Sequence, residues 1–220
     1  GTIPANRSSF AVKGAMHHPD ACFRAELEKR LKGKGITLDK QKIEDGERHA
    51  LFTLVSPFLK DIVYYTNKNS INLFAEALGE LISPTDYART VKAELSGMGI
   101  DSCGITLKDA SGLSPANAVP AEVFTDLLIW AKGHLSDVFV ASLPQGNVDW
   151  GLRIYSDHPI LRGNILAKTG SMSGVRALAG YLKTQRGETL AFTILVNNYV
   201  GDPVKVQEII RDLLKEFADK

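Results

Sequence analysis

The chain has 220 residues, of which 44% are hydrophobic and 23% are charged, and its formal net charge is +1. This composition is typical of a soluble globular protein with one main core, and it argues against disorder. The near balance of 26 basic and 25 acidic residues gives no indication of binding to nucleic acid or to an anionic membrane surface. No apolar run is long enough to be a membrane span.

Neither the cysteines nor the histidines indicate a metal site. Cys22 and Cys103 lie in no CxxC motif and are interpreted as two separate buried thiols, with a disulfide as the alternative in an oxidising compartment. His17 and His18 are expected to face solvent, and the other histidines lack the spacing of metal ligands. We therefore expect no metal and no other cofactor.

Helices dominate the first two thirds of the predicted structure. Periodicity and turn residues predict helices over 19–32, 56–69, 70–82, 84–97, 120–132 and 136–143, strands over 9–12, 36–38, 47–55 and 105–108, and a turn-rich loop over 109–114. Residues 144–163 show no regular pattern and contain Trp150, Arg153 and Arg162. This long loop is interpreted either as the wall of a cleft or as a surface loop with solvated arginines.

Two polar residues begin the helix predicted over 70–82. Ser70 and Asn72 lie off its apolar stripe, which recurs at spacings of three and four residues. One interpretation is helix capping, because Ser and Asn are common at helix starts. The alternative is that both side chains face a cleft.

Three strands and a final helix are predicted after residue 163. Short Gly-containing turns separate strands over 165–171, 175–183 and 190–196, which indicates antiparallel hairpins. The third strand is apolar on both faces apart from Thr193, so we expect it to be central and covered on both sides. Asp202 and Pro203 begin the last helix, which should cover one face of the sheet. Its apolar face consists of Val206, Ile209, Ile210, Leu213, Leu214 and Phe217.

The first of these strands carries a cation, two hydroxyls and a glycine in sequence. Lys168, Thr169 and Ser171 could hold a terminal carboxylate, and Gly170 would let a ligand approach the backbone closely. An extended peptide could pair with such a strand edge, and a backbone N–H there could face an oxyanion. The alternative is a surface Lys and Thr beside a strand-ending Gly.

Three motifs in a fixed order resemble a known family. Ser70-Ile71-Asn72 stands within NKNSINLFAEAL, DASGLSPAN follows, and Lys168-Thr169-Gly170 stands within AKTGSMSGVRALAGYL. From about Ser9 to the end, the chain resembles the C-terminal part of D-alanyl-D-alanine carboxypeptidases, the low-molecular-mass penicillin-binding proteins with inserted domains. The resemblance implies an α+β fold of the penicillin-binding and β-lactamase type, with an antiparallel sheet covered by helices, incomplete on its N-terminal side.

The family implies a serine acyl-transfer mechanism with motifs Ser-x-x-Lys, Ser-x-Asn and Lys-Thr-Gly. By position, Ser70 would relay a proton to the leaving amine and Asn72 would bind the substrate amide. Lys168 would attract the substrate carboxylate and change the proton affinity of the Ser70 hydroxyl. Thr169 and Ser171 would bind that carboxylate beside Gly170, and the Ser171 N–H would supply half of the oxyanion hole.

The nucleophile motif is absent, because no serine has lysine three positions later. The chain also starts at Gly1, so we expect a segment of a longer protein that is inactive alone, with residues 1–18 a remnant of an inserted domain or linker and 19–220 the C-terminal part of the peptidase domain. The loop 146–152 also departs from the family, in which a Gly-Thr-Leu is expected at its end. Trp150 in this loop would alter that wall of the cleft. Exposed apolar surface, or a partner covering it, would accompany an incomplete fold.

The resemblance implies a parent that is exported to the periplasm or cell surface. There it would act as carboxypeptidase or endopeptidase on peptidoglycan peptides and be inhibited by β-lactams in its full-length form. An alternative of another class is a non-catalytic peptidoglycan-binding or interaction module with the same fold. A class A or C β-lactamase shares the chemistry, but its flanking residues match less well.

Overall fold

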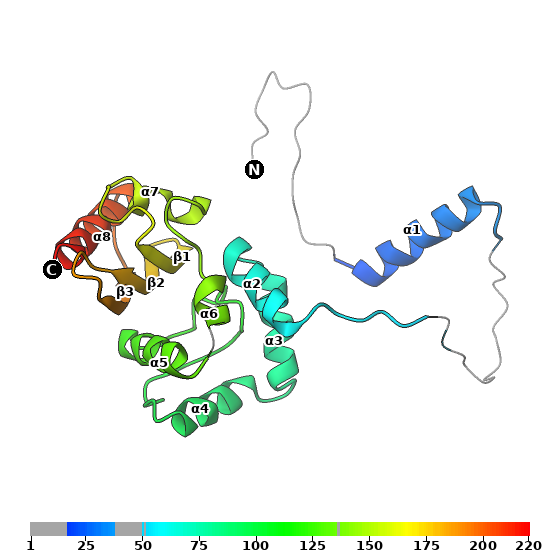
Figure 1. Cartoon of the computed structure of the whole chain (residues 1–220). Helices are drawn as coiled ribbons and strands as arrows, with labels where there is room; N and C mark the ends of the chain where they lie inside the picture. The colour runs from blue at the N-terminus through cyan, green and yellow to red at the C-terminus, as the bar shows by residue number, and fades with distance from the viewer. Residues whose placement is uncertain (1–16, 38–49, 51, 136) are drawn as a thin grey trace, which may run out of the picture. The chain divides into compact units, whose positions relative to one another are not determined.

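The computed structural model describes residues 17–37, 50, 52–135 and 137–220 (Figure 1). The chain divides into two units, residues 1–54 and 55–220, which are considered separately. In the first unit, α1 (Pro19–Gly33) confirms the helix predicted over 19–32. No residue of α1 is buried, and two of its apolar residues, Phe23 and Leu27, are exposed. The predicted boundary at residue 18 stays a prediction.

The strand predicted over 47–55 is wrong where it can be compared. Residues 50 and 52–55 have no regular structure, and residues 47–49 and 51 lie outside the described residues, as does the strand predicted over 9–12. Phe52, Leu54 and Val55 are exposed. Alternating apolar residues give a segment strand propensity, but a strand forms only where another strand and a core face are available.

In the second unit, all the predicted helices are present, and their ends lie within three residues of the predicted ones. They are α2 (Leu59–Asn69), α3 (Asn72–Ile82), α4 (Tyr87–Gly97), α5 (Ala121–His134) and α6 (Asp137–Ser142). The strand predicted over 105–108 is only an isolated bridge between Thr106 and Ala118. The segment 144–163, predicted to be irregular, contains the 3₁₀ turn η1 (Trp150–Leu152) and the short helix α7 (Arg153–Ser156).

The sheet has three antiparallel strands in the order β1-β2-β3, as the hairpin turns predicted. They are β1 (Ile165–Met172), β2 (Val175–Lys183) and β3 (Thr189–Asn197). Within the described residues β3 pairs only with β2. The strand predicted over 9–12 lies outside the described residues, so the central position of β3 stays a prediction. Helices pack on both faces of the sheet, as the apolar composition of β3 predicted.

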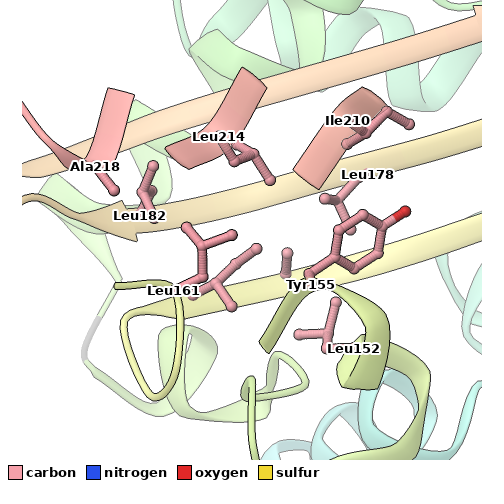
Figure 2. Close-up of a cluster of buried hydrophobic side chains, with 10 residues drawn as sticks. Leu152, Tyr155, Leu161, Leu178, Leu182, Ile210, Leu214 and Ala218 are labelled. Carbon is pink, nitrogen blue, oxygen red and sulfur yellow. The ribbon is translucent and has the colours of Figure 1, made fainter. Parts of the chain in front are cut away.

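One face of the sheet packs against α8 (Pro203–Ala218) and α7 (Figure 2). The buried cluster there contains Leu152, Tyr155, Leu161, Ile165, Ala167, Leu178, Leu182, Ile210, Leu214 and Ala218. Asp202 caps α8 as predicted, because its Oδ1 accepts the Val204 N–H at 2.8 Å. The predicted apolar face of α8 is split. Its half that includes Ile210 is buried, whereas Ile209 is 69% exposed, and Leu213 and Phe217 are also exposed.

The opposite face of the sheet packs against α5. Tyr181 is buried there and donates its hydroxyl to the Leu128 carbonyl at 2.6 Å. Residues paired across antiparallel strands share a face, and Lys168 pairs with Ala179, which packs in this α5 cluster. The Lys168 side chain therefore lies on the α5 face, while Thr169 pairs with Leu178 and lies on the α8 face. Among the described helices, none is long and apolar enough to cross a membrane.

Candidate active site

Ser70 lies in a tight connection between α2 and α3. Its φ is 53°, in the left-handed region, and it forms the C-cap of α2. The N-cap of α3 is Ile71, which makes no side-chain capping bond. The capping interpretation of Ser70 and Asn72 is therefore wrong, because neither side chain caps the helix. The left-handed conformation is unfavourable for a residue with a Cβ, and residues held in such strained conformations cluster at functional sites.

Lys168 reaches this connection from β1. Its Nζ donates to Ser70 Oγ at 2.9 Å and to the Thr169 carbonyl at 2.9 Å, which joins positions 98 residues apart in sequence. Burial lowers the pKa of the Lys168 ammonium from its ordinary value, because desolvation disfavours the charged form. No carboxylate among the described residues forms an ion pair with it.

Thr169, Gly170 and Ser171 lie on the outer edge of β1. Earlier in the strand, the Ala167 N–H donates outward to the Pro144 carbonyl, and the Ile165 carbonyl accepts outward from the Gly146 N–H, both at 2.9 Å. Backbone groups of an antiparallel edge strand alternate in direction, so Thr169 and Ser171 also direct their N–H groups outward. Past residue 167, this edge has no backbone partner among the described residues.

Gly170 is closely packed from the neighbouring strand. A Cβ at this position would lie 3.2 Å from the Ala177 Cβ, which is tighter than most real contacts. Asn72 is exposed as the first residue of α3, and its side chain makes no hydrogen bond to the described part of the chain. The structure thus brings Ser70 and Lys168 into contact, places Asn72 on the next turn, and leaves the edge at Ser171 open.

The segment before β1 forms one side of this region. A Cβ built on Gly151 would lie 3.6 Å from Thr169 Oγ1, and η1 packs against β1. The cleft-wall interpretation of the segment stays a prediction. Trp150 is 87% exposed beside Gly151, whereas Arg153 and Arg162 are solvent-exposed, as the surface-loop interpretation expected.

Sequence reasoning missed the residues that support Ser70. Lys68 and Asp149 form an ion pair at 3.0 Å, and Asn67 donates to Ser142 Oγ at 2.8 Å. The available signal was the position of Asn67 and Lys68 directly before Ser70. Elsewhere, Cys22 and Cys103 are both free and exposed, so the expectation of buried thiols is wrong. The described residues contain no group of three or more His, Cys, Asp or Glu that could hold a metal ion.

The chain combines an antiparallel sheet between helices with a strand lysine that is hydrogen-bonded to the serine of a Ser-x-Asn motif. This arrangement is that of the penicillin-binding proteins. The chain belongs to the D-Ala-D-Ala carboxypeptidase 3 (S13) family, whose sequence profile matches residues 1–220. These are serine-type carboxypeptidases. The resemblance inferred from the three motifs is confirmed.

Individual relatives agree with this assignment. The chain is 30% identical to a D-alanyl-D-alanine carboxypeptidase of Actinomadura sp., over 99% of this chain and 44% of the relative. It is 29% identical to the D-alanyl-D-alanine carboxypeptidase DacB of Haemophilus influenzae, over 92% of this chain and 46% of the relative. The chain thus spans slightly less than half the length of these relatives.

Solved structures confirm the α+β fold. Penicillin-binding protein 4 from Haemophilus influenzae, complexed with a β-lactam, superposes with a TM-score of 0.83 at 28% identity, over 96% of this chain and 54% of that chain. A predatory endopeptidase from Bdellovibrio bacteriovorus shares the fold, with a TM-score of 0.63 at 16% identity over 94% of this chain and 57% of its own. An extended-spectrum β-lactamase shares it more distantly, with a TM-score of 0.59 at 17% identity over 73% of this chain and 63% of its own.

Proposed function

We propose that this chain supplies the carboxylate-binding and proton-relay part of a serine-type D-Ala-D-Ala carboxypeptidase or endopeptidase that acts on peptidoglycan stem peptides. The observation that carries the proposal is the 2.9 Å contact between Lys168 Nζ and Ser70 Oγ in a chain of the D-Ala-D-Ala carboxypeptidase family. This contact brings together residues of the Ser-x-Asn and Lys-Thr-Gly motifs, 98 residues apart in sequence, which supports the proposal.

In the proposed mechanism, the peptide lies along the outer edge of β1. Lys168 attracts its terminal carboxylate from the α5 face, and the hydroxyls of Thr169 and Ser171 donate to the same carboxylate from the other face, across the open edge of the strand. The Ser171 N–H faces the carbonyl oxygen, where it stabilises the developing oxyanion. Gly170 keeps the strand free of a side chain at the point of closest approach. The open edge beyond Ala167 supports this placement.

Ser70 carries the proton in this scheme. It lies next to an ammonium, which stabilises the alkoxide form of its hydroxyl, so the proton can pass to the leaving amine as the peptide bond breaks. Asn72 holds the amide of the substrate from the start of α3. Both roles agree with the lack of any capping function for these side chains.

The nucleophile is not in these 220 residues, because they contain no Ser-x-x-Lys. The acyl-enzyme of this chemistry is an ester of that serine, so we expect the chain to form no acyl-enzyme alone. The same absence favours a second candidate, a non-catalytic peptidoglycan-binding module. A longer polypeptide that supplies Ser-x-x-Lys would distinguish the two, because only the enzyme should then bind fluorescent penicillin covalently, and should lose that label when Lys168 is replaced by Met.

Binding by this chain itself can be tested with an N-acetylated peptide ending in D-Ala-D-Ala, titrated into ¹⁵N-labelled protein. We expect amide shifts at Thr169 and Ser171, and their loss in Lys168→Met. Lys183→Met is the matched control, because Lys183 is an exposed residue at the end of β2. Binding that survives Lys168→Met, or a stoichiometric penicillin adduct on this chain, would overturn the proposal.

The proposed location follows from the substrate. Peptidoglycan lies outside the cytoplasmic membrane, so the parent protein should be exported to the periplasm or the cell surface. β-Lactams should inhibit its full-length form, which agrees with the β-lactam bound to the Haemophilus influenzae relative.

A further inference from the structure

Residues 142–149, called here the bridging segment, are bonded to the end of α2. Asn67 Nδ2 donates to Ser142 Oγ at 2.8 Å. Lys68 Nζ donates to the Leu143 carbonyl at 2.6 Å and to Asp149 Oδ2 at 3.0 Å. Asn67 and Lys68 lie in the last turn of α2, just before Ser70. The bridging segment therefore fixes the helix end from which the Ser70 hydroxyl projects.

The same segment is bonded to β1. The Pro144 carbonyl accepts the Ala167 N–H, and the Gly146 N–H donates to the Ile165 carbonyl, each at 2.9 Å. Ala167 directly precedes Lys168. One eight-residue segment thus makes hydrogen bonds both to the helix that carries Ser70 and to the strand that carries Lys168.

The ion pair within this arrangement is well enclosed. The side chains of Lys68 and Asp149 are only 13% and 23% exposed. Asp149 Oδ2 also accepts the Gln145 N–H at 2.6 Å, and Lys68 Nζ lies 5.7 Å from the centre of the Tyr64 ring. Each charge therefore has several partners, which is the condition under which a partly buried ion pair holds its neighbours in one geometry.

Other ion pairs in the chain differ in this respect. The side chains of Arg89 and Asp86 are 84% and 46% exposed and lie three residues apart on one helix. Exposed pairs of this kind contribute little to structure. The Lys68–Asp149 pair instead joins elements 81 residues apart in sequence.

We propose that Lys68 and Asp149 are positioning residues that hold the Ser70 hydroxyl at bonding distance from the Lys168 ammonium. Lys68 acts through Asn69, the one residue between it and Ser70, and Asp149 acts through the bridging segment on β1. Neither residue needs to contact the substrate. The role of this geometry in catalysis depends on the proposed function, but the positioning itself does not.

The test measures the titration of Lys168 by NMR in protein with ¹³C-labelled lysine, with the signal assigned through Lys168→Met. We expect Asp149→Asn and Lys68→Met to shift the pKa of Lys168 upward toward its ordinary value of 10.5, because a displaced Ser70 connection admits water to the ammonium. Lys68→Arg should restore most of the wild-type titration. Asp86→Asn is the matched control and should leave Lys168 unchanged, because it breaks an exposed pair.

A purely structural role would lower the melting temperature without changing this titration. An unchanged Lys168 pKa in folded Asp149→Asn would therefore overturn the proposal. Asp149→Asn keeps the shape of the side chain, so it remains informative if Lys68→Met does not fold. The same samples can be titrated with the D-Ala-D-Ala peptide. If the wild-type protein does not bind the peptide but Asp149→Asn still shifts the Lys168 pKa, the proposed function is refuted and the positioning role stands.

Discussion

The left-handed backbone of Ser70 allows the cost of a strained conformation to be measured. With φ at 53°, the Cβ of Ser70 lies close to the neighbouring backbone, a strain of roughly 1–2 kcal/mol for residues other than glycine. We compare Ser70→Ala with Ser70→Gly. Both remove the hydroxyl that accepts from Lys168, but only glycine relieves the strain.

The expected difference follows from these terms. The lost hydrogen bond is common to both variants and cancels in the comparison. Glycine should therefore be more stable than alanine at this position by about 1 kcal/mol, as is found at other left-handed helix ends. For a domain of this size, that difference corresponds to a melting temperature higher by about 2–4 °C.

Urea denaturation followed by circular dichroism measures the two free energies of unfolding. Asn69→Ala and Asn69→Gly form the control pair, because Asn69 is the last residue within α2. There glycine should be less stable than alanine by about 0.5–1 kcal/mol. Equal stabilities at position 70, or a more stable alanine variant, would refute the claim that Ser70 is strained.

Two further predictions concern Lys168 and the sheet. Burial lowers the pKa of Lys168 in the folded state, so just below pH 10.5 the unfolded state binds more protons than the folded state. The free energy of unfolding of the wild type should therefore rise, relative to that of Lys168→Met, as the pH increases through this window. Parallel pH dependences would show that Lys168 is not desolvated. Gly180→Ala should unfold the sheet or cost more than about 3 kcal/mol, because its Cβ would overlap the Leu166 carbonyl and Ala167. Gly133→Ala in α5, with no atom within 4 Å, should instead stabilise the protein by about 0.5–1 kcal/mol; thermal melts of both variants provide the comparison.

Elements that depend on local signals could be predicted from the sequence. The turn glycines fixed both hairpins, and the span of β2 was predicted without error. Likewise, Asp202 caps α8 as expected. Elements that depend on distant partners could not be predicted. The segment 52–55 has strand propensity but no strand partner in the described residues. The sequence pattern of β3 predicted that both its faces are covered, but an apolar pattern by itself does not identify the neighbouring strands.

The candidate site shows the same division. Spacing along the chain gave no reason for Ser70 and Lys168 to meet, and the expectation came from the family resemblance. Lys68 and Asp149 could not be found at all, because a lysine and an aspartate 81 residues apart look like ordinary solvated charges. Only the coordinates reveal that both are largely enclosed.

Two unfavourable features coincide at the Ser70–Lys168 contact. Ser70 adopts a conformation that glycine would adopt at lower cost, and Lys168 keeps an ammonium where burial disfavours charge. Neither feature contributes to the hydrophobic core, whose clusters on the two faces of the sheet contain neither residue. Strain and desolvation that persist without a stabilising role are typical of functional sites, which supports the proposed function. The enclosed Lys68–Asp149 pair explains how the fold maintains the strained Ser70 and the desolvated Lys168. Lys68 is bonded to the Leu143 carbonyl and to Asp149, and Asp149 accepts the Gln145 N–H, so the end of α2 is held to the bridging segment that also contacts β1.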